Sequence, residues 1–212
     1  MGSEMCIRDR ILGISLKEQG IDTCYPEEKS FWYVKAPAFS FAKLNGMDAY
    51  LSPEMKSTGE AIGYDRKFPR AMYKALIASG VKMQNYGTVM VTLADEDKEE
   101  ALPLIRRFYE MGFNIEATVG TGEFLKAHGI RTRIRRKLSE NSTEILEAIR
   151  SGYVSYVINT RAILSGVHYE DGLAIRRTAI ENNVTMFTSL DTVKVLLDVL
   201  EEITIGVSPL YA

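Results

Sequence analysis

Hydrophobic and polar positions follow two alternating patterns along the second half of the chain. Short apolar, β-branched runs predict five strands, at residues 88–92, 113–117, 130–135, 154–158 and 185–188. Between them, apolar positions at helical spacing predict helices at about residues 98–111, 122–128, 143–150, 172–181 and 191–201. Strands that alternate with helices form parallel sheets with right-handed crossovers. The pattern therefore predicts a three-layer α/β/α domain around a five-stranded parallel sheet.

Several residues indicate where these helices begin and end. The segment from Asp97 to Glu100 fits a capping box at the start of the first helix. Glycines stand at expected helix C-termini, at Gly112, Gly129 and Gly152. Because an interior proline removes a hydrogen bond, Pro103 predicts a later helix start or a mild kink.

The first half of the chain is less regular. Residues 31–40 predict an extended segment, and residues 66–79 predict a helix capped by Asp65. The helix is expected to bury one apolar face, made of Phe68, Met72, Ala75 and Leu76. These elements form no complete repeat, so we expect them to be the end of a domain whose beginning is missing. The first ten residues, MGSEMCIRDR, are too polar for a secretory signal, and we expect a non-native leader there.

Composition narrows the function classes. The chain has 212 residues, of which 46% are apolar and 25% charged, as in ordinary globular proteins. Lys and Arg total 26 against 28 Asp and Glu, a net charge of -2, which argues against nucleic-acid or anionic-membrane partners. Two cysteines, Cys6 and Cys24, and two isolated histidines, His128 and His168, predict neither a disulfide framework nor a metal site. We expect a cytoplasmic protein.

Polar residues gather where three predicted strands end, which is where open α/β sheets bind ligands. They are Thr92 and Lys98 after the first strand, the turn Thr118-Val119-Gly120-Thr121-Gly122 after the second, and Asn159-Thr160-Arg161 after the fourth. Hydroxyls, flexible glycines and free N–H groups at a helix start suit a phosphate. The alternative is that Thr121 only caps its helix and that Lys98 and Lys137 are solvated surface charges.

A basic run, RTRIRRK, occupies residues 131–137. Arg131, Arg133 and Arg135 alternate and so share one face of the third strand. We interpret them as a charged edge strand that resists aggregation. A nucleic-acid groove is the alternative, although aromatic residues do not interleave the run. Lys137 lies past the strand end and is the member best placed to reach the ligand crevice.

The chain resembles a known family in several of its segments. Residues 33–63, YVKAPAFSFAKLNGMDAYLSPEMKSTGEAIG, resemble the close of the second ATP-grasp half of the carbamoyl phosphate synthase large subunit. The segments ADEDKEEALPL, ATVGTGEFL, YVINT and DGLAIRRTAIE resemble that subunit's C-terminal regulatory domain, which has the methylglyoxal-synthase-like fold. The resemblance covers roughly residues 11–202. It implies an ATP-grasp remnant with a linker helix at residues 11–83 and the regulatory domain at 84–212.

The resemblance also implies a function. That family makes carbamoyl phosphate from ATP, bicarbonate and glutamine-derived ammonia for pyrimidine and arginine biosynthesis, with a glutaminase small subunit as partner. Its regulatory domain has sheet order 3-2-1-4-5 and binds UMP, or in some members IMP. The implied phosphate contacts are Thr118, Thr121 and Lys137, in a pocket lined by Thr92, Lys98, Asn159 and Arg161. Arg161 replaces a threonine of well-known members, which leaves the choice of nucleotide open.

Catalytic parts of that family are missing. The parent uses ATP with Mg²⁺ or Mn²⁺, but the Glu-x-Asn-Pro-Arg metal motif and the glycine-rich loop do not occur in this sequence. We therefore expect no cofactor in this fragment and no synthesis of carbamoyl phosphate by it.

Two other functions stay open at this stage. His168 and Asp171, which precede a helix bearing Arg177, resemble the histidine and neighbouring aspartate of methylglyoxal synthase, a phosphate lyase. Further aspartates of that enzyme correspond to Ser142 and Arg161. The other possibility is a purely structural or oligomerisation module, which would use apolar helix positions at Val193, Leu196, Leu197 and Leu200.

Overall fold

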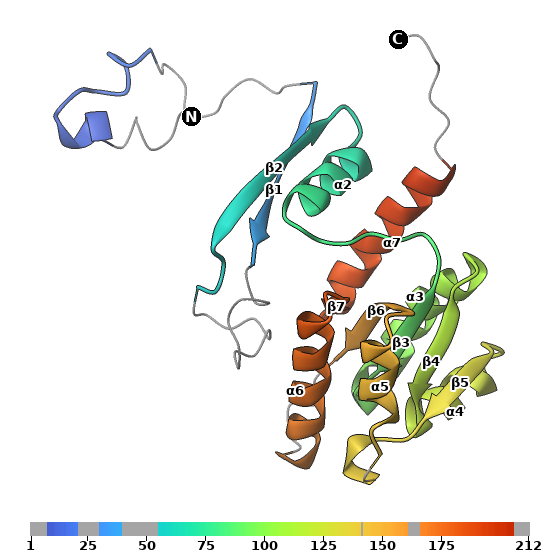
Figure 1. Cartoon of the computed structure of the whole chain (residues 1–212). Helices are drawn as coiled ribbons and strands as arrows, with labels where there is room; N and C mark the ends of the chain where they lie inside the picture. Colours follow the sequence, from blue (N-terminus) through green and yellow to red (C-terminus); the bar gives the residue numbers. More distant parts are fainter. Residues whose placement is uncertain (1–7, 21–29, 40–54, 141, 161–165, 206–212) are drawn as a thin grey trace. The chain divides into compact units, whose positions relative to one another are not determined.

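The computed structural model describes residues 8–20, 30–39, 55–140, 142–160 and 166–205. The chain divides into two compact units, residues 1–30 and 31–212. In the first unit, the described part contains one helical turn at residues 8–11. All the elements considered below belong to the second unit (Figure 1).

A two-stranded antiparallel hairpin opens the second unit. Strand β1 (Trp32–Ala38) pairs with β2 (Gly59–Asp65), and helix α2 (Phe68–Ala78) packs on them. At Gly63 a Cβ would lie 2.2 Å from the Ala71 carbonyl oxygen, so only glycine permits this close approach. The predicted extended segment and helix are thus confirmed.

Two details of this region differ from the prediction. The buried face of α2 is centred on Ala71 and Ala75, whereas Phe68 is exposed, because the helix lies too close to β2 for larger side chains. Asp65 ends β2 instead of capping the helix, and Lys67 is the N-cap residue. The Asp65 carboxylate still accepts a hydrogen bond from the Lys67 backbone N–H at 3.1 Å.

Five parallel strands form the sheet of the following domain. They are β3 (Thr88–Thr92), β4 (Asn114–Thr118), β5 (Thr132–Arg135), β6 (Val154–Asn159) and β7 (Thr185–Phe187). The helices are α3 (Lys98–Glu110), α4 (Val119–Ala127), α5 (Glu144–Arg150), α6 (Gly166–Glu181) and α7 (Leu190–Ile205). The strand order is β5-β4-β3-β6-β7. It equals the expected 3-2-1-4-5, and the α/β class is confirmed.

Each face of the sheet is covered by its own helices (Figure 1). One core cluster joins β3, β4, β6 and β7 to α3, α4 and α7, and the other joins Met90 and Val157 to α5 and α6. The apolar positions of α7 proposed for a structural interface are buried in the first cluster: Val193, Leu196, Leu197 and Leu200. They pack within the domain and are not exposed for a partner.

The ends of the helices show which of the predicted start and stop residues are correct. Gly112, Gly129 and Gly152 have φ of 91°, 79° and 79°, as C-terminal glycines require. The capping box is wrong: residues Asp95–Asp97 form a short 3₁₀ helix, and the Asp97 side chain makes no capping bond. The later helix start is also wrong, since α3 begins at Lys98 and contains Pro103.

Tyr156 is fully buried in the first core cluster, yet its hydroxyl is paired. It donates a hydrogen bond to the Gln84 carbonyl and accepts one from the Gln84 N–H, each at 2.7 Å. Burial raises the pKa of this phenol from 10.0 to about 12. The folded state therefore keeps a proton that the unfolded chain releases near pH 10.

This shift predicts a loss of stability at alkaline pH. The contribution of Tyr156 is fully present below pH 10 and is lost as the pH rises towards 12, by on the order of 2–3 kcal/mol in total. Other groups also titrate in this pH range, so the free energies of unfolding of wild type and Tyr156→Phe are compared. Urea unfolding between pH 9 and 11.5 measures both. The stability difference between wild type and variant should shrink with pH. A constant difference would show that the phenol does not titrate with unfolding.

Candidate functional site

The carboxyl ends of β3, β4 and β6 meet at one end of the sheet. The helix after β3 covers one face, and the helix after β6 covers the opposite face. The winding direction therefore reverses between β3 and β6, and such switch points are where open α/β sheets bind ligands. The predicted crevice residues follow these strands.

Thr92 and Asn159 lie together at the switch point. Asn159 Nδ2 donates a hydrogen bond to Thr92 Oγ1 at 2.7 Å, and Thr92 Oγ1 donates to the Ile158 carbonyl at 3.3 Å. Both side chains are buried. The two residues that the sequence assigned to separate strand ends thus form one polar unit.

Thr118 and Thr121 form a second polar unit beside it. Thr118 Oγ1 donates to Thr121 Oγ1 at 3.3 Å, and the Leu93 N–H donates to the same Thr121 oxygen at 3.4 Å. The alternative that Thr121 caps the helix is wrong, because α4 begins at Val119 and Thr118 is its N-cap residue. Thr118 itself makes no side-chain capping bond.

Helix α4 therefore points its amino end at these hydroxyls. The first N–H groups of a helix have no partner within the helix, and its dipole places partial positive charge there. Gly120 lies in this first turn and carries no side chain that would cover the backbone. The turn can accept an anion chemically, with threonine hydroxyls alongside.

Lys98 reaches across to the same turn from the start of α3. Its ammonium lies 3.2 Å from the Gly120 carbonyl oxygen and 2.6 Å from the Asp95 carboxylate. Only 17% of the Lys98 side chain is exposed. The alternative of a solvated surface charge is therefore wrong for Lys98, whose cation is held over the first turn of α4.

The structure does not join the other two predicted residues, Lys137 and Arg161, to these contacts. Lys137 follows β5 by two residues and is half-buried, and within the described residues it makes no hydrogen bond or ion pair with its ammonium. Arg161 lies outside the described residues. The structure brings together Thr92, Lys98, Thr118, Thr121 and Asn159, while a role for Lys137 and Arg161 stays a prediction.

Two polar contacts near the crevice were not predicted from the sequence. Thr160 Oγ1 accepts a hydrogen bond from the Ala94 N–H at 2.9 Å and so ties the loop after β6 to the loop after β3. Asp171 Oδ2 accepts one from the Ser139 N–H at 3.1 Å. The Asn-Thr pair after β6 was the available signal for the first contact. The sequence singled out Asp171 for its resemblance to an aspartate of methylglyoxal synthase, but nothing local pointed to its contact with Ser139.

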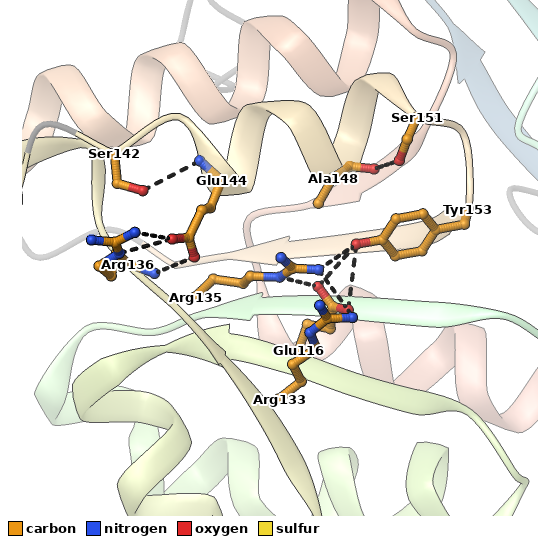
Figure 2. Close-up of polar contacts among 9 residues, drawn as sticks. All are labelled: Glu116, Arg133, Arg135, Arg136, Ser142, Glu144, Ala148, Ser151 and Tyr153. Atoms are coloured by element: carbon orange, nitrogen blue, oxygen red, sulfur yellow. Dashed lines mark hydrogen bonds and ion pairs between the residues drawn. The ribbon is translucent and has the colours of Figure 1, made fainter.

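A separate ionic cluster lies on β4 and β5 (Figure 2). Glu116 is only 4% exposed and accepts hydrogen bonds from Arg135 Nε at 2.7 Å and Arg135 Nη2 at 3.2 Å. The Tyr153 hydroxyl donates to the same carboxylate, and Arg133 lies 3.8 Å from it. These contacts with Glu116 raise the pKa of the Arg135 guanidinium, and burial followed by the Glu116 charge raises that of the Tyr153 phenol. Both groups stay protonated at neutral pH.

This cluster refines the interpretation of the basic run. Strand β5 is at the sheet edge, as expected. Arg135 is nevertheless half-buried and paired with a buried carboxylate, so it is not a solvated protective charge. A hollow of about 740 Å³ adjoins the cluster; it is lined by Thr88, Tyr109, Gly112, Phe113, Asn114, Ile115, Glu116, Arg131, Arg133 and Tyr153. None of the residues predicted to bind phosphate lines this hollow.

One comparison with known proteins bears on the domain. A model of the MGS-like domain matches residues 100–188. Residues 100–188 form an MGS-like domain. The match runs from α3 to β7 and includes the hydroxyl pair and Asn159. The MGS-like domain fits both the regulatory domain of carbamoyl phosphate synthase and a methylglyoxal-synthase-type fold.

Within the part of the chain that the structure describes, no helix combines the length and the apolar character that crossing a membrane requires.

Proposed function

We propose that the crevice binds the phosphate of a nucleoside monophosphate, UMP or IMP, as the allosteric regulatory domain of a carbamoyl phosphate synthase large subunit. The observation that carries the proposal is the position of the Lys98 ammonium, 3.2 Å from the Gly120 carbonyl in the first turn of α4. That turn belongs to the MGS-like domain and also carries the Thr118 and Thr121 hydroxyls.

The chemistry of the crevice suits a phosphate monoester dianion. It combines one cation, two hydroxyls and the free N–H groups of a helix start, which are the groups that recur in phosphate sites. Lys137 would add a second cation from the adjacent strand end. Arg161, whose position a threonine fills in well-known members of the resembled family, would either add a cationic contact to the phosphate or fill the base and ribose space, and so bears on the choice between UMP and IMP.

In this proposal the chain acts as part of a larger protein. Its partners are the rest of the large subunit and a glutaminase small subunit in the cytoplasm, and residues 11–83 correspond to the end of the second ATP-grasp half. Effector binding then changes a distant phosphorylation step through a coupling free energy, typically 1–3 kcal/mol. Incubated alone with ATP, bicarbonate and ammonia, the chain should release no ADP above background. Measurable turnover would contradict this part of the proposal.

Thr121→Ala and Lys137→Ala test the proposed phosphate contacts. Each should weaken UMP binding by on the order of 1–3 kcal/mol, through loss of a hydroxyl contact or of a charge-assisted hydrogen bond. Isothermal titration calorimetry measures the effect. Thr185→Ala is the matched control, because Thr185 opens the parallel strand β7 and so lies at the amino edge of the sheet, opposite the strand ends that form the crevice. Unchanged UMP affinity in both test variants would reject this pocket.

The alternative is a phosphate lyase of the methylglyoxal synthase type, which the MGS-like match equally fits. Proton abstraction next to a carbonyl needs a free carboxylate base. Asp171 already accepts a hydrogen bond from the Ser139 backbone, and Ser142 is a hydroxyl where that enzyme carries an aspartate. An assay for methylglyoxal formed from dihydroxyacetone phosphate separates the two functions, and we expect no product.

A further inference from the structure

Arg176 occupies an unexpected position for a permanently charged side chain. It lies on α6 and is only 2% exposed, next to Ile175 on the face that packs against the sheet. Burying a guanidinium without hydrogen-bond partners costs several kcal/mol, so its surroundings must supply acceptors. Arg176 Nη1 donates a hydrogen bond to Asn159 Oδ1 at 3.0 Å.

Gly172, one turn earlier on α6, leaves space for this contact. A Cβ at position 172 would lie 2.9 Å from Arg176 Nη1 and 3.4 Å from Asn159 Oδ1. Any other residue would therefore push the guanidinium or the carboxamide aside. A glycine inside a helix is destabilising relative to alanine, and here the close approach of Arg176 and Asn159 explains it.

The contact fixes which way the Asn159 carboxamide faces. A guanidinium only donates hydrogen bonds, so it must face the amide oxygen and not the NH₂ group. The NH₂ group is thereby directed to Thr92 Oγ1, at the end of β3, where it donates at 2.7 Å. Arg176, Asn159 and Thr92 thus form a chain in which each member donates to the next, ending at the Ile158 carbonyl.

We infer that Arg176 is a positioning residue of the crevice, which holds the Asn159 carboxamide so that its N–H donors face the strand ends. The inference rests on the proposed binding of a nucleoside monophosphate. Arg176 acts through Asn159 and need not touch the ligand. With Asn159 held in this orientation, one N–H of its carboxamide donates to Thr92 and the second is left to donate to an acceptor oxygen of an anion. A flipped carboxamide would present an oxygen there, which would repel the anion.

Arg176→Met tests the inference, because methionine keeps much of the apolar stem and removes the donors. UMP affinity measured by calorimetry should fall about tenfold, which corresponds to the loss of about 1.4 kcal/mol. Arg176→Lys, which keeps a donor, should recover part of the affinity. In an Asn159→Ala background, Arg176→Met should cause no further loss, since its effect passes through that carboxamide.

Ile175→Val is the control for a merely structural effect. It removes one methyl group from the neighbouring core position, so it should lower the free energy of unfolding without changing UMP affinity. If wild type binds UMP and Arg176→Met binds it equally well, the positioning role is wrong while the proposed function stands. The role is also wrong if the two substitutions at 159 and 176 are additive. If wild type does not bind UMP or IMP at all, the proposed function fails and this role fails with it.

Discussion

Lys98→Met should weaken UMP binding by on the order of 10- to 100-fold. The ammonium lies over the first turn of α4, and only 17% of the side chain is exposed, so water screens its attraction for a phosphate weakly. The substitution also leaves the Asp95 carboxylate without the cation 2.6 Å away, and its charge then opposes the ligand. Isothermal titration calorimetry at constant ionic strength measures the loss.

Two matched variants make this result specific. Lys126→Met removes an exposed lysine from α4 at the same change in net charge, and it should leave UMP affinity unchanged. Asp95→Asn removes the carboxylate that competes for the Lys98 ammonium, and it should strengthen binding several-fold. Equal losses in Lys98→Met and Lys126→Met would show that only the overall charge matters.

Glu116→Ala should lower the free energy of unfolding by about 3 kcal/mol, the largest stability effect that we expect from removing a charged side chain of this domain. The carboxylate is 4% exposed and accepts two hydrogen bonds from Arg135 and one from Tyr153 (Figure 2). Its removal leaves the guanidinium of Arg135, itself 15% exposed, without its main counter-charge. Urea unfolding at pH 7 measures the change.

The second ion pair in Figure 2 is the control. Arg136 and Glu144 are paired at 2.7 Å, but the side chains are 69% and 30% exposed, so Glu144→Ala should lower the free energy of unfolding far less than Glu116→Ala does. The double change Glu116→Leu with Arg135→Met should recover much of the lost stability, since it leaves no buried charge unpaired. A cost below about 1 kcal/mol for Glu116→Ala would contradict this account of the cluster.

The strands of the sheet could be predicted because their signal is local. Each is a short apolar run between helical segments, and the expected positions agree with the observed ones within one or two residues, as for β3 and β6. The sheet order followed from the family resemblance and not from periodicity, because pairing between strands depends on contacts distant in the sequence. The structure confirms that order.

The start of α4 could not be predicted because tertiary packing outweighs local propensity there. Gly120 and Gly122 favour a loop, yet both lie inside the helix. A Cβ at position 122 would lie 2.8 Å from Ile134 Cγ1 on β5, so glycine is needed for the helix to approach that strand. Because α4 begins at Val119, Thr121 is a first-turn residue beside Thr118 and not the helix cap that the alternative interpretation gave it.

The buried charges were equally hidden from sequence patterns. Arg176 is one of many charged residues on amphipathic helices, and its partner Asn159 lies 17 residues away at a strand end. Glu116 on β4 pairs with Arg135 on the neighbouring strand β5, and no local spacing in the sequence indicates this pair. The crevice residues were found because they follow strand ends, whereas these positioning and stabilising residues depend on long-range contacts.

The central claim is that the crevice at the carboxyl ends of β3, β4 and β6 holds a phosphate monoester. Backbone amide chemical shifts of the full chain, recorded by NMR during titration with UMP, test it most directly. The account predicts the largest shifts at Gly120, Thr121 and Lys98, and much weaker ones with uridine, which lacks the phosphate. Shifts centred instead on Arg131 and Arg133 in the hollow beside Glu116, or equal responses to UMP and uridine, would contradict it.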